Sequence, residues 1–149
     1  MIEMKEIKKA VNMLLKDFNY KIYGLEVTEG FEKPAFFTEL VLQEEESINI
    51  NTFKRTVLCT ITFFQKKSDE ADALNKFELI RKKIISEKTR MKPMLSVCDR
   101  LIPVSDLHIN YTGEKRNIPQ YIFTLEYLDK EEIIEKQTVI HNVEFRLEG

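Results

Sequence analysis

Two stretches of the chain carry apolar residues at the three- and four-residue spacing of an amphipathic helix. The first spans residues 2–18, and its apolar stripe consists of Ile7, Val11, Leu14, Leu15 and Phe18. The second spans residues 68–86, and its stripe consists of Ala73, Leu74, Phe77, Ile80, Ile84 and Ile85. Ser68 is a suitable N-cap for the second helix, and Asp69 and Glu70 would follow in its first turn, where the helix dipole favours negative charge. The pattern therefore predicts two helices that each bury one face.

Six further stretches alternate or cluster apolar residues as strands do. They are residues 20–27, 35–43, 47–65, 105–111, 120–128 and 138–147. The third of these, 47–65, would span roughly 60 Å at about 3.3 Å per residue, which is too long for a compact sheet. We therefore expect a break near residues 51–52, with residues 44–51 projecting as a loop or ribbon. Residues 94–104, which contain Pro103, are expected to be irregular or to form a short strand.

The predicted elements follow one another in the order α-β-β-β-α-β-β(-β), where the bracketed strand is 138–147. Two helices with one apolar stripe each would pack on one face of a mostly antiparallel or mixed sheet, so we expect an α+β fold. A chain of 149 residues is expected to form one domain, 1–149, in which 129–149 is a C-terminal extension.

The stretch GFEKPAFFTELVLQEEES, residues 30–47, places two adjacent phenylalanines shortly before three glutamates. In a strand, Phe36 and Phe37 would point to opposite faces of the sheet. One ring would enter the core and the other would remain available to a neighbour. The acidic triplet, Glu44, Glu45 and Glu46, is either the solvated end of a hairpin or a contact made in an oligomer.

Composition narrows the class of protein. Hydrophobic residues make up 43% of the chain and charged residues 32%, which is typical of a soluble globular protein. The net charge of −2 predicts no general attraction to nucleic acid or to an anionic membrane. Residues 1–18 are interrupted by charge every two or three positions, so they do not resemble a signal peptide, and we expect synthesis in the cytoplasm.

Candidate chemistry is sparse. The two cysteines, Cys59 and Cys98, are expected to be reduced and mostly buried thiols, although a disulfide remains an alternative. His108 and His141 are expected to lie at the surface or to be hydrogen-bonded, and a zinc site would require them to converge with both cysteines. None of the four glycines lies in a phosphate-binding motif, and we predict no cofactor and no metal.

Two further groups of charged residues have alternative interpretations. Glu39 and Glu126 each lie within an apolar strand, where they belong either to the polar face of a half-covered sheet or to a catalytic pair. Six basic residues lie at and beyond the end of the second helix. They are Arg81, Lys82, Lys83, Lys88, Arg90 and Lys92. This cluster is either solvated charge at a helix end or a contact with an acidic partner, and no aromatic residues interleave with it as nucleic-acid binding would favour.

The order of elements and four stretches resemble the tail terminator (tail-completion) proteins of tailed bacteriophages and phage-tail-like particles. The stretches are GFEKPAFFTEL, TFKRTVLCTITFF, SDEADALNKFELIRKKI and YIFTLEYL, and the resemblance covers residues 2–128. It implies a structural, non-enzymatic α+β subunit of the virion tail, assembled in the host cytoplasm. Such subunits form a hexameric ring that caps the head-proximal end of the tail tube, stops tube polymerisation and provides the docking surface for the head-side connector.

The resemblance also implies partners. They are other copies of the chain, the tail-tube protein, the head-side connector protein and, in a contractile particle, the sheath protein, whether the particle is a phage or bacteriocin-like. No membrane and no sequence-specific nucleic acid is expected among them. The candidate contacts with neighbouring subunits or partners are Phe36, Phe37, Glu44, Glu45, Glu46, Phe53, Arg55, Arg81 and Lys82.

Two alternatives accompany this interpretation. The first is another head–tail connector or a tail-tube subunit. The second is a small-ligand-binding α+β module, which would require polar side chains to converge in a concavity. The candidates for such convergence are Thr38, Glu39, Thr124 and Glu126.

Overall fold

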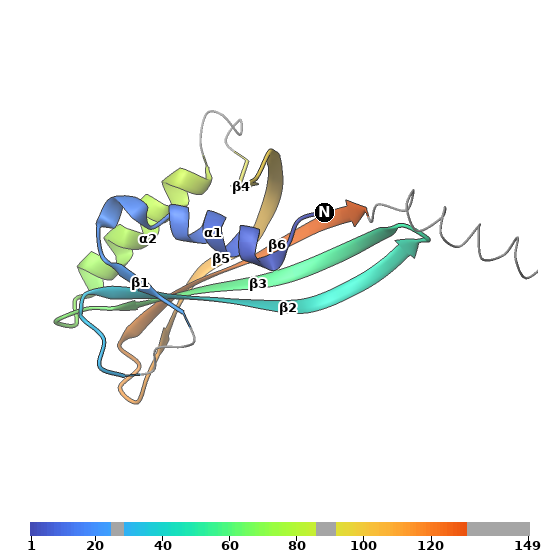
Figure 1. The fold of residues 1–149 in the computed structure, drawn as a ribbon. Helices are drawn as coiled ribbons and strands as arrows, with labels where there is room; N and C mark the ends of the chain where they lie inside the picture. The colour runs from blue at the N-terminus through green and yellow to red at the C-terminus, as the bar shows by residue number, and fades with distance from the viewer. Residues whose placement is uncertain (25–28, 86–91, 131–149) are drawn as a thin grey trace, which may run out of the picture.

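A computed structural model describes residues 1–24, 29–85 and 92–130. Its elements follow the chain in the order α1 (Met4–Met13), a 3₁₀ turn (Lys16–Phe18), β1 (Lys21–Tyr23), β2 (Ala35–Asn49), β3 (Thr52–Phe64), α2 (Glu70–Ile84), β4 (Met94–Val97), β5 (Arg100–Thr112) and β6 (Ile118–Lys130). The six strands form one sheet in the order β1-β2-β3-β6-β5-β4. Only β1 and β2 pair in parallel, so the sheet is mixed and the predicted α+β class is confirmed (Figure 1).

Both predicted helices are present but shorter than expected. The first ends at Met13 and continues as the 3₁₀ turn, after which Asn19 adopts a left-handed conformation with φ of 59° and ends the segment. The second begins one residue later than predicted. Its N-cap is Asp69 rather than Ser68, because the Asp69 carboxylate accepts a hydrogen bond from the backbone N–H of Asp72 at 3.3 Å.

The strands differ from the prediction mainly in their lengths. The first predicted strand is reduced to the three residues of β1. β2 does not stop before the acidic triplet but continues through it to Asn49, and the chain turns at residues 50–51, where a break was expected. The interpretation of the triplet as the end of the hairpin is therefore wrong. The predicted strand 138–147 lies outside the described residues.

Residues 94–104, expected to be irregular or a short strand, form β4 and the beginning of β5. Pro103 lies inside β5 without breaking it. β4 pairs with Arg100–Pro103, whereas β6 pairs with β5 from Val104 onward. Pro103 therefore lies where β5 passes from one partner strand to the other. No hydrogen bond from a backbone N–H is needed at that position, so proline is tolerated there.

One hydrophobic core joins both helices to one face of the sheet. From the two helices and the residues that follow α1 it includes Ile7, Val11, Leu14, Leu15, Ile80 and Ile84. From the central strands it includes Phe36, Val57, Cys59, Ile61, Phe63, Tyr121, Phe123, Leu125 and Tyr127. The predicted alternation in β6 is confirmed, because its four odd-numbered residues from Tyr121 to Tyr127 are all buried. The opposite face of the central strands is half-buried or exposed.

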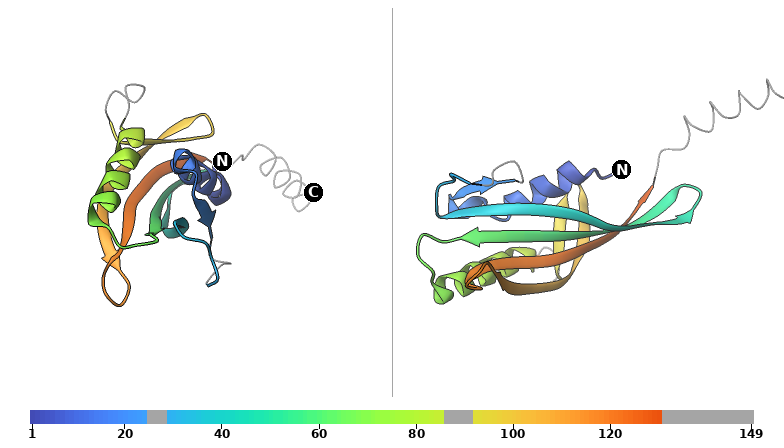
Figure 2. Two further views of the ribbon diagram at one scale, coloured as in Figure 1. Left: turned by 90° about the vertical axis from the view of Figure 1, so that its left-hand side faces the viewer. Right: turned by 90° about the horizontal axis from the view of Figure 1, so that it is seen from below.

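The β2–β3 hairpin extends well past the helices (Figures 1 and 2). We call its projecting part, residues 44–55, the arm. The end of β6 pairs with the β3 side of the arm, from Arg55 opposite Tyr127 to Thr52 opposite Lys130. The expected projecting ribbon is thus present as an antiparallel hairpin, with register shifts between Leu42 and Glu44 and between Ser47 and Asn49.

Candidate assembly surfaces

The arm exposes one strand of its hairpin almost completely. Every residue from position 41 to position 50 is exposed. Ile48 and Ile50 keep 51% and 87% of their surface accessible. Because β1 pairs only with Ala35–Phe37, the outer edge of β2 beyond these residues has no partner strand among the described residues. An exposed isoleucine on an unpaired edge, as Ile48 is, and another in the adjacent turn, Ile50, are costly in an isolated subunit and are typical of a contact surface.

The acidic triplet is divided by the pleat of β2. Glu45 lies opposite Arg55 and forms an ion pair with it, with 3.2 Å between Oε1 and Nε. Glu44 and Glu46 lie opposite Thr56 and Lys54 on the other face of the arm. Neither Glu44 nor Glu46 forms an ion pair within the described residues. The triplet therefore consists of one structural carboxylate and two that are available to a partner.

Arg55 is a partly buried residue that makes contacts at the base of the arm. Its side chain is only 15% exposed. Its Nη1 donates to the backbone carbonyl of Ile2 at 3.4 Å and to the hydroxyl of Tyr127 at 3.3 Å. Phe53, another predicted contact, is half-buried and lies between Ser47 and Asp129 in the sheet register.

Phe36 and Phe37 point to opposite faces of the sheet, as predicted. Phe36 is fully buried and packs against Phe63, with 4.9 Å between ring centroids. Phe37 is half-buried on the other face, in an aromatic group with the rings of Tyr23, Phe31 and Phe64. Phe37 is thus the outward ring, although its own chain already covers part of it.

The basic residues at the end of α2 are divided in a similar way. Arg81 and Lys82 are exposed. Lys83 donates to the backbone carbonyl of Leu14 at 2.9 Å and forms an ion pair with Asp17 at 2.8 Å, so it ties α2 to the end of the N-terminal helical segment. Lys88 and Arg90 of the predicted cluster lie outside the described residues.

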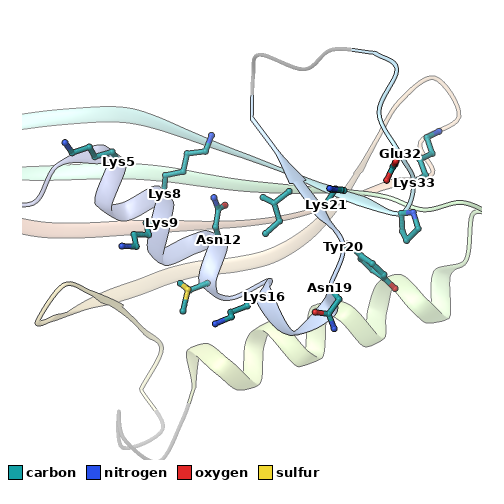
Figure 3. Close-up of a pocket in the computed structure, with 13 residues that line it drawn as sticks. Lys5, Lys8, Lys9, Asn12, Lys16, Asn19, Tyr20, Lys21, Glu32 and Lys33 are labelled. Atoms are coloured by element: carbon teal, nitrogen blue, oxygen red, sulfur yellow. The ribbon is translucent and has the colours of Figure 1, made fainter.

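A basic groove between α1 and β1 was missed by the sequence analysis. It encloses about 970 Å³, and Figure 3 shows its lining residues on α1, on β1 and on the segment before β2. The lining residues are Lys5, Lys8, Lys9, Asn12, Met13, Lys16, Asn19, Tyr20, Lys21, Ile22, Glu32, Lys33 and Pro34. The groove therefore carries six lysines and a single carboxylate. We call it the lysine groove.

Two hydrogen bonds hold the walls of the groove in place. Lys8 Nζ donates to the backbone carbonyl of Thr38 at 3.0 Å. Thr38 follows Phe37, which forms the last β1–β2 pair with Tyr23. The Thr38 hydroxyl donates to Asn12 Oδ1 at 2.9 Å, which holds α1 against β2. The helical spacing of Lys5, Lys8, Lys9, Asn12 and Lys16 was the available sequence signal, because these positions share one side of a helix.

The remaining candidate residues do not form a reaction centre. Thr38 is buried on the core face, whereas Glu39, Thr124 and Glu126 belong to the opposite face, and Glu126 forms an ion pair with Lys54 at 3.3 Å. The four side chains therefore do not converge. The described residues contain no group of three metal-binding side chains. None of the described helices is long and apolar enough to cross a membrane.

The cysteines differ in environment. Cys59 is a buried free thiol, as predicted, whereas Cys98 is free but exposed, so the prediction of burial is wrong for Cys98. The reason is its place in the β4–β5 turn, where its φ is 53°. His108 is exposed, and His141 lies outside the described residues.

Comparison with known proteins adds one informative match. A family model described as phage tail terminator protein matches residues 6–137. No curated protein matches the chain at a significant level. One similar solved structure is 7% identical to this chain, with a TM-score of 0.44, and the match covers 88% of this chain and 97% of that one. A likeness that distant supports no statement about function.

Proposed function

The chain belongs to the phage tail terminator family, and from this premise we propose that it forms a hexameric ring at the head-proximal end of the tail tube. In this role the ring ends tube polymerisation and provides the docking surface for the head-side connector. The observation that carries the proposal is the family match, which spans both the body of the subunit and the arm. The family is structural, so the proposed mechanism is binding and not catalysis.

The shape of the subunit supports a closed ring. A cyclic assembly requires a heterologous interface, in which one surface of each copy meets a different surface of the next. The subunit has two unlike surfaces of this kind, the arm and the lysine groove. A stable interface buries on the order of 1,000 Å² or more of surface. A few surface side chains do not supply this area, whereas a projecting element such as the arm adds to it.

We assign the remaining exposed candidates to partners outside the ring. Arg81 and Lys82 are exposed in the last turn of α2 and would face a tail component such as the connector or, in a contractile particle, the sheath. The half-buried Phe37 group on the uncovered sheet face would meet the tail-tube protein. Aromatic and arginine side chains are the residue types most enriched in the energetic centres of interfaces.

The proposal is tested by polymerising the cognate tail-tube protein in the presence of this chain. We expect tubes that carry a ring at one end, and a mean tube length that falls as the amount of added protein rises. Native mass spectrometry of the capped ends should give six copies. Protein added only after tubes have grown should cap them without shortening them, which is the control for fragmentation. An unchanged length distribution with no added density at either tube end would refute the proposal.

A further inference from the structure

We propose that the arm of one subunit docks into the lysine groove of the neighbouring copy. This inference rests on the proposed ring for its setting and specifies which two surfaces meet. Three independent observations carry it: complementary charge, complementary apolar surface, and the position of the two surfaces on the subunit.

The charges of the two surfaces are opposite and largely uncompensated. Glu44 and Glu46 project from one face of the arm and form no ion pair among the described residues. The groove contributes six lysines against one carboxylate, Glu32. Of the six, only Lys5 forms an ion pair among the described residues, with Glu3 at 3.2 Å. Two free carboxylates entering a site of excess positive charge would steer the two copies together and fix their register.

The apolar surfaces also match. Ile48 and Ile50 lie at the end of the arm and are the most exposed isoleucines among the described residues. Between its lysines the groove presents apolar surface from Met13, Ile22 and Pro34. Covering Ile50 would remove from water a side chain that is 87% exposed in the free subunit. Because burial of apolar surface stabilises a contact, the tip would anchor the interface while the glutamates orient it.

The positions of the two surfaces make the contact intermolecular. The arm points away from β1 (Figure 1), whose residues Lys21 and Ile22 line the groove of the same subunit. Its two strands pair from Glu44 opposite Thr56 to Asn49 opposite Thr52, with one register shift between Ser47 and Asn49. At about 3.3 Å per residue the arm reaches about 20 Å beyond its base. A second copy of the chain is therefore the occupant that fits the groove, and repetition of the same contact produces a head-to-tail series that can close.

Charge reversal tests the electrostatic part of this contact under conditions in which the wild-type protein assembles. The arm variant carries Glu44→Lys and Glu46→Lys, the groove variant Lys9→Glu and Lys21→Glu. Each should raise the concentration needed for half-assembly by on the order of tenfold, because like charges would then face one another. The variant with all four changes should return toward the wild-type value. The control pair, Glu114→Lys and Lys115→Glu, lies in the exposed β5–β6 turn and should have no effect.

Cross-linking tests the contact without relying on ring formation. In a Cys98→Ser background, protein with Ile50→Cys is mixed with protein with Met13→Cys and treated with a short bis-maleimide. We expect covalent heterodimers, identified by mass and by the cross-linked peptide. A control mixture in which Glu114→Cys replaces Met13→Cys should give none, because Glu114 lies in the exposed β5–β6 turn and does not line the groove.

The outcomes separate this inference from the proposed function. If both reversal variants form rings at the wild-type concentration and no tip-to-groove cross-link appears, the arm–groove contact is refuted. The proposed ring is not affected by that outcome. Cross-linked heterodimers from a protein that caps no tubes would support the contact and refute the terminator ring. Loss of assembly that the fourfold variant does not reverse would count against charge pairing, provided that circular dichroism shows each variant to be folded.

Discussion

Glu45 and Arg55 face one another across the β2–β3 hairpin, with 3.2 Å between Glu45 Oε1 and Arg55 Nε. The Nε–H is not directed at an acceptor, so the contact is an ion pair and not a hydrogen bond. Nη1 of the same guanidinium donates to the Ile2 carbonyl and to the Tyr127 hydroxyl. Arg55 therefore joins the arm, the N-terminal segment and β6 at the point where the arm leaves the body.

Replacing Arg55 with methionine should destabilise the protein by about 1–3 kcal/mol, because the Tyr127 hydroxyl and the Ile2 carbonyl lose a charged donor in a partly buried place. Urea unfolding followed by circular dichroism measures the change. The matched control is Lys54→Met, which removes a pair with Glu126 in which both side chains are more than a third exposed. That pair should contribute less than about 1 kcal/mol. Equal effects of the two substitutions would contradict the structural role of Arg55.

The environment of Asp72 is expected to make the stability of the fold sensitive to acid. Burial alone would raise the pKa of Asp72, but hydrogen bonds from Lys76 and Gln65 and the charge of Lys76, whose Nζ is 2.7 Å away, hold that pKa below its ordinary value of 3.8. A carboxylate with a depressed folded-state pKa contributes stability above its unfolded pKa and loses it as the pH falls through the folded value. The wild-type protein should therefore become less stable as the pH is lowered past 3.8, in part because Asp72 becomes protonated.

The variant that checks this is Asp72→Asn, compared with wild type by urea unfolding at several values between about pH 7 and about pH 2. The variant should be less stable at neutral pH, and the difference should shrink as the pH falls below 3.8. Glu114→Gln, in the exposed β5–β6 turn, should give a profile parallel to wild type. A constant difference between Asp72→Asn and wild type across the whole range would contradict the assignment.

The two thiols should react very differently. Burial raises the pKa of Cys59 to about 12, so its reactive thiolate is scarce as well as inaccessible. Cys98 is exposed, although desolvation and the nearby Glu6 carboxylate raise the pKa of its thiol as well. We expect an Ellman titration to count one slowly reacting thiol per native chain and two in denaturant. Native Cys98→Ser protein should not react, and rapid modification of Cys59 in it would reveal opening of the core.

Elements with strict alternation could be predicted from the sequence. β6 alternates buried and less buried residues along its length. The apolar stripe of α2 also predicted a helix there, although its N-cap is Asp69 and not the predicted Ser68. The opposite faces of Phe36 and Phe37 followed from the period of two of any strand. The expected projection near residues 44–51 followed from the length of the apolar run.

Other features depend on partners distant in the sequence. The triplet Glu44–Glu46 has low strand propensity, yet it continues β2, where Glu45 lies opposite Arg55 and forms an ion pair with it. β4 is a strand only because the first residues of β5 pair with it. The lysine groove brings α1 together with residues 32–34, a proximity that arises from the β1–β2 pairing and leaves no continuous motif.

The adjacent phenylalanines supply a last test, which separates folding from assembly. Phe36→Ala should cost about 3–5 kcal/mol, because it empties a fully buried site beside Phe63, and Phe36→Lys should prevent folding. Phe37→Lys should cost less, because its ring is half-buried and the new ammonium can reach solvent from the uncovered face. The Phe37→Lys protein should stay folded by circular dichroism, yet it should fail to cap tail tubes, because the Phe37 group is assigned to the tube contact.

Phe64→Leu, which trims the same aromatic group without adding charge, is the control and should retain capping. Folded Phe37→Lys protein that caps tubes normally would show that this face makes no essential contact, whereas unfolding of both lysine variants would show that Phe37 belongs to the core.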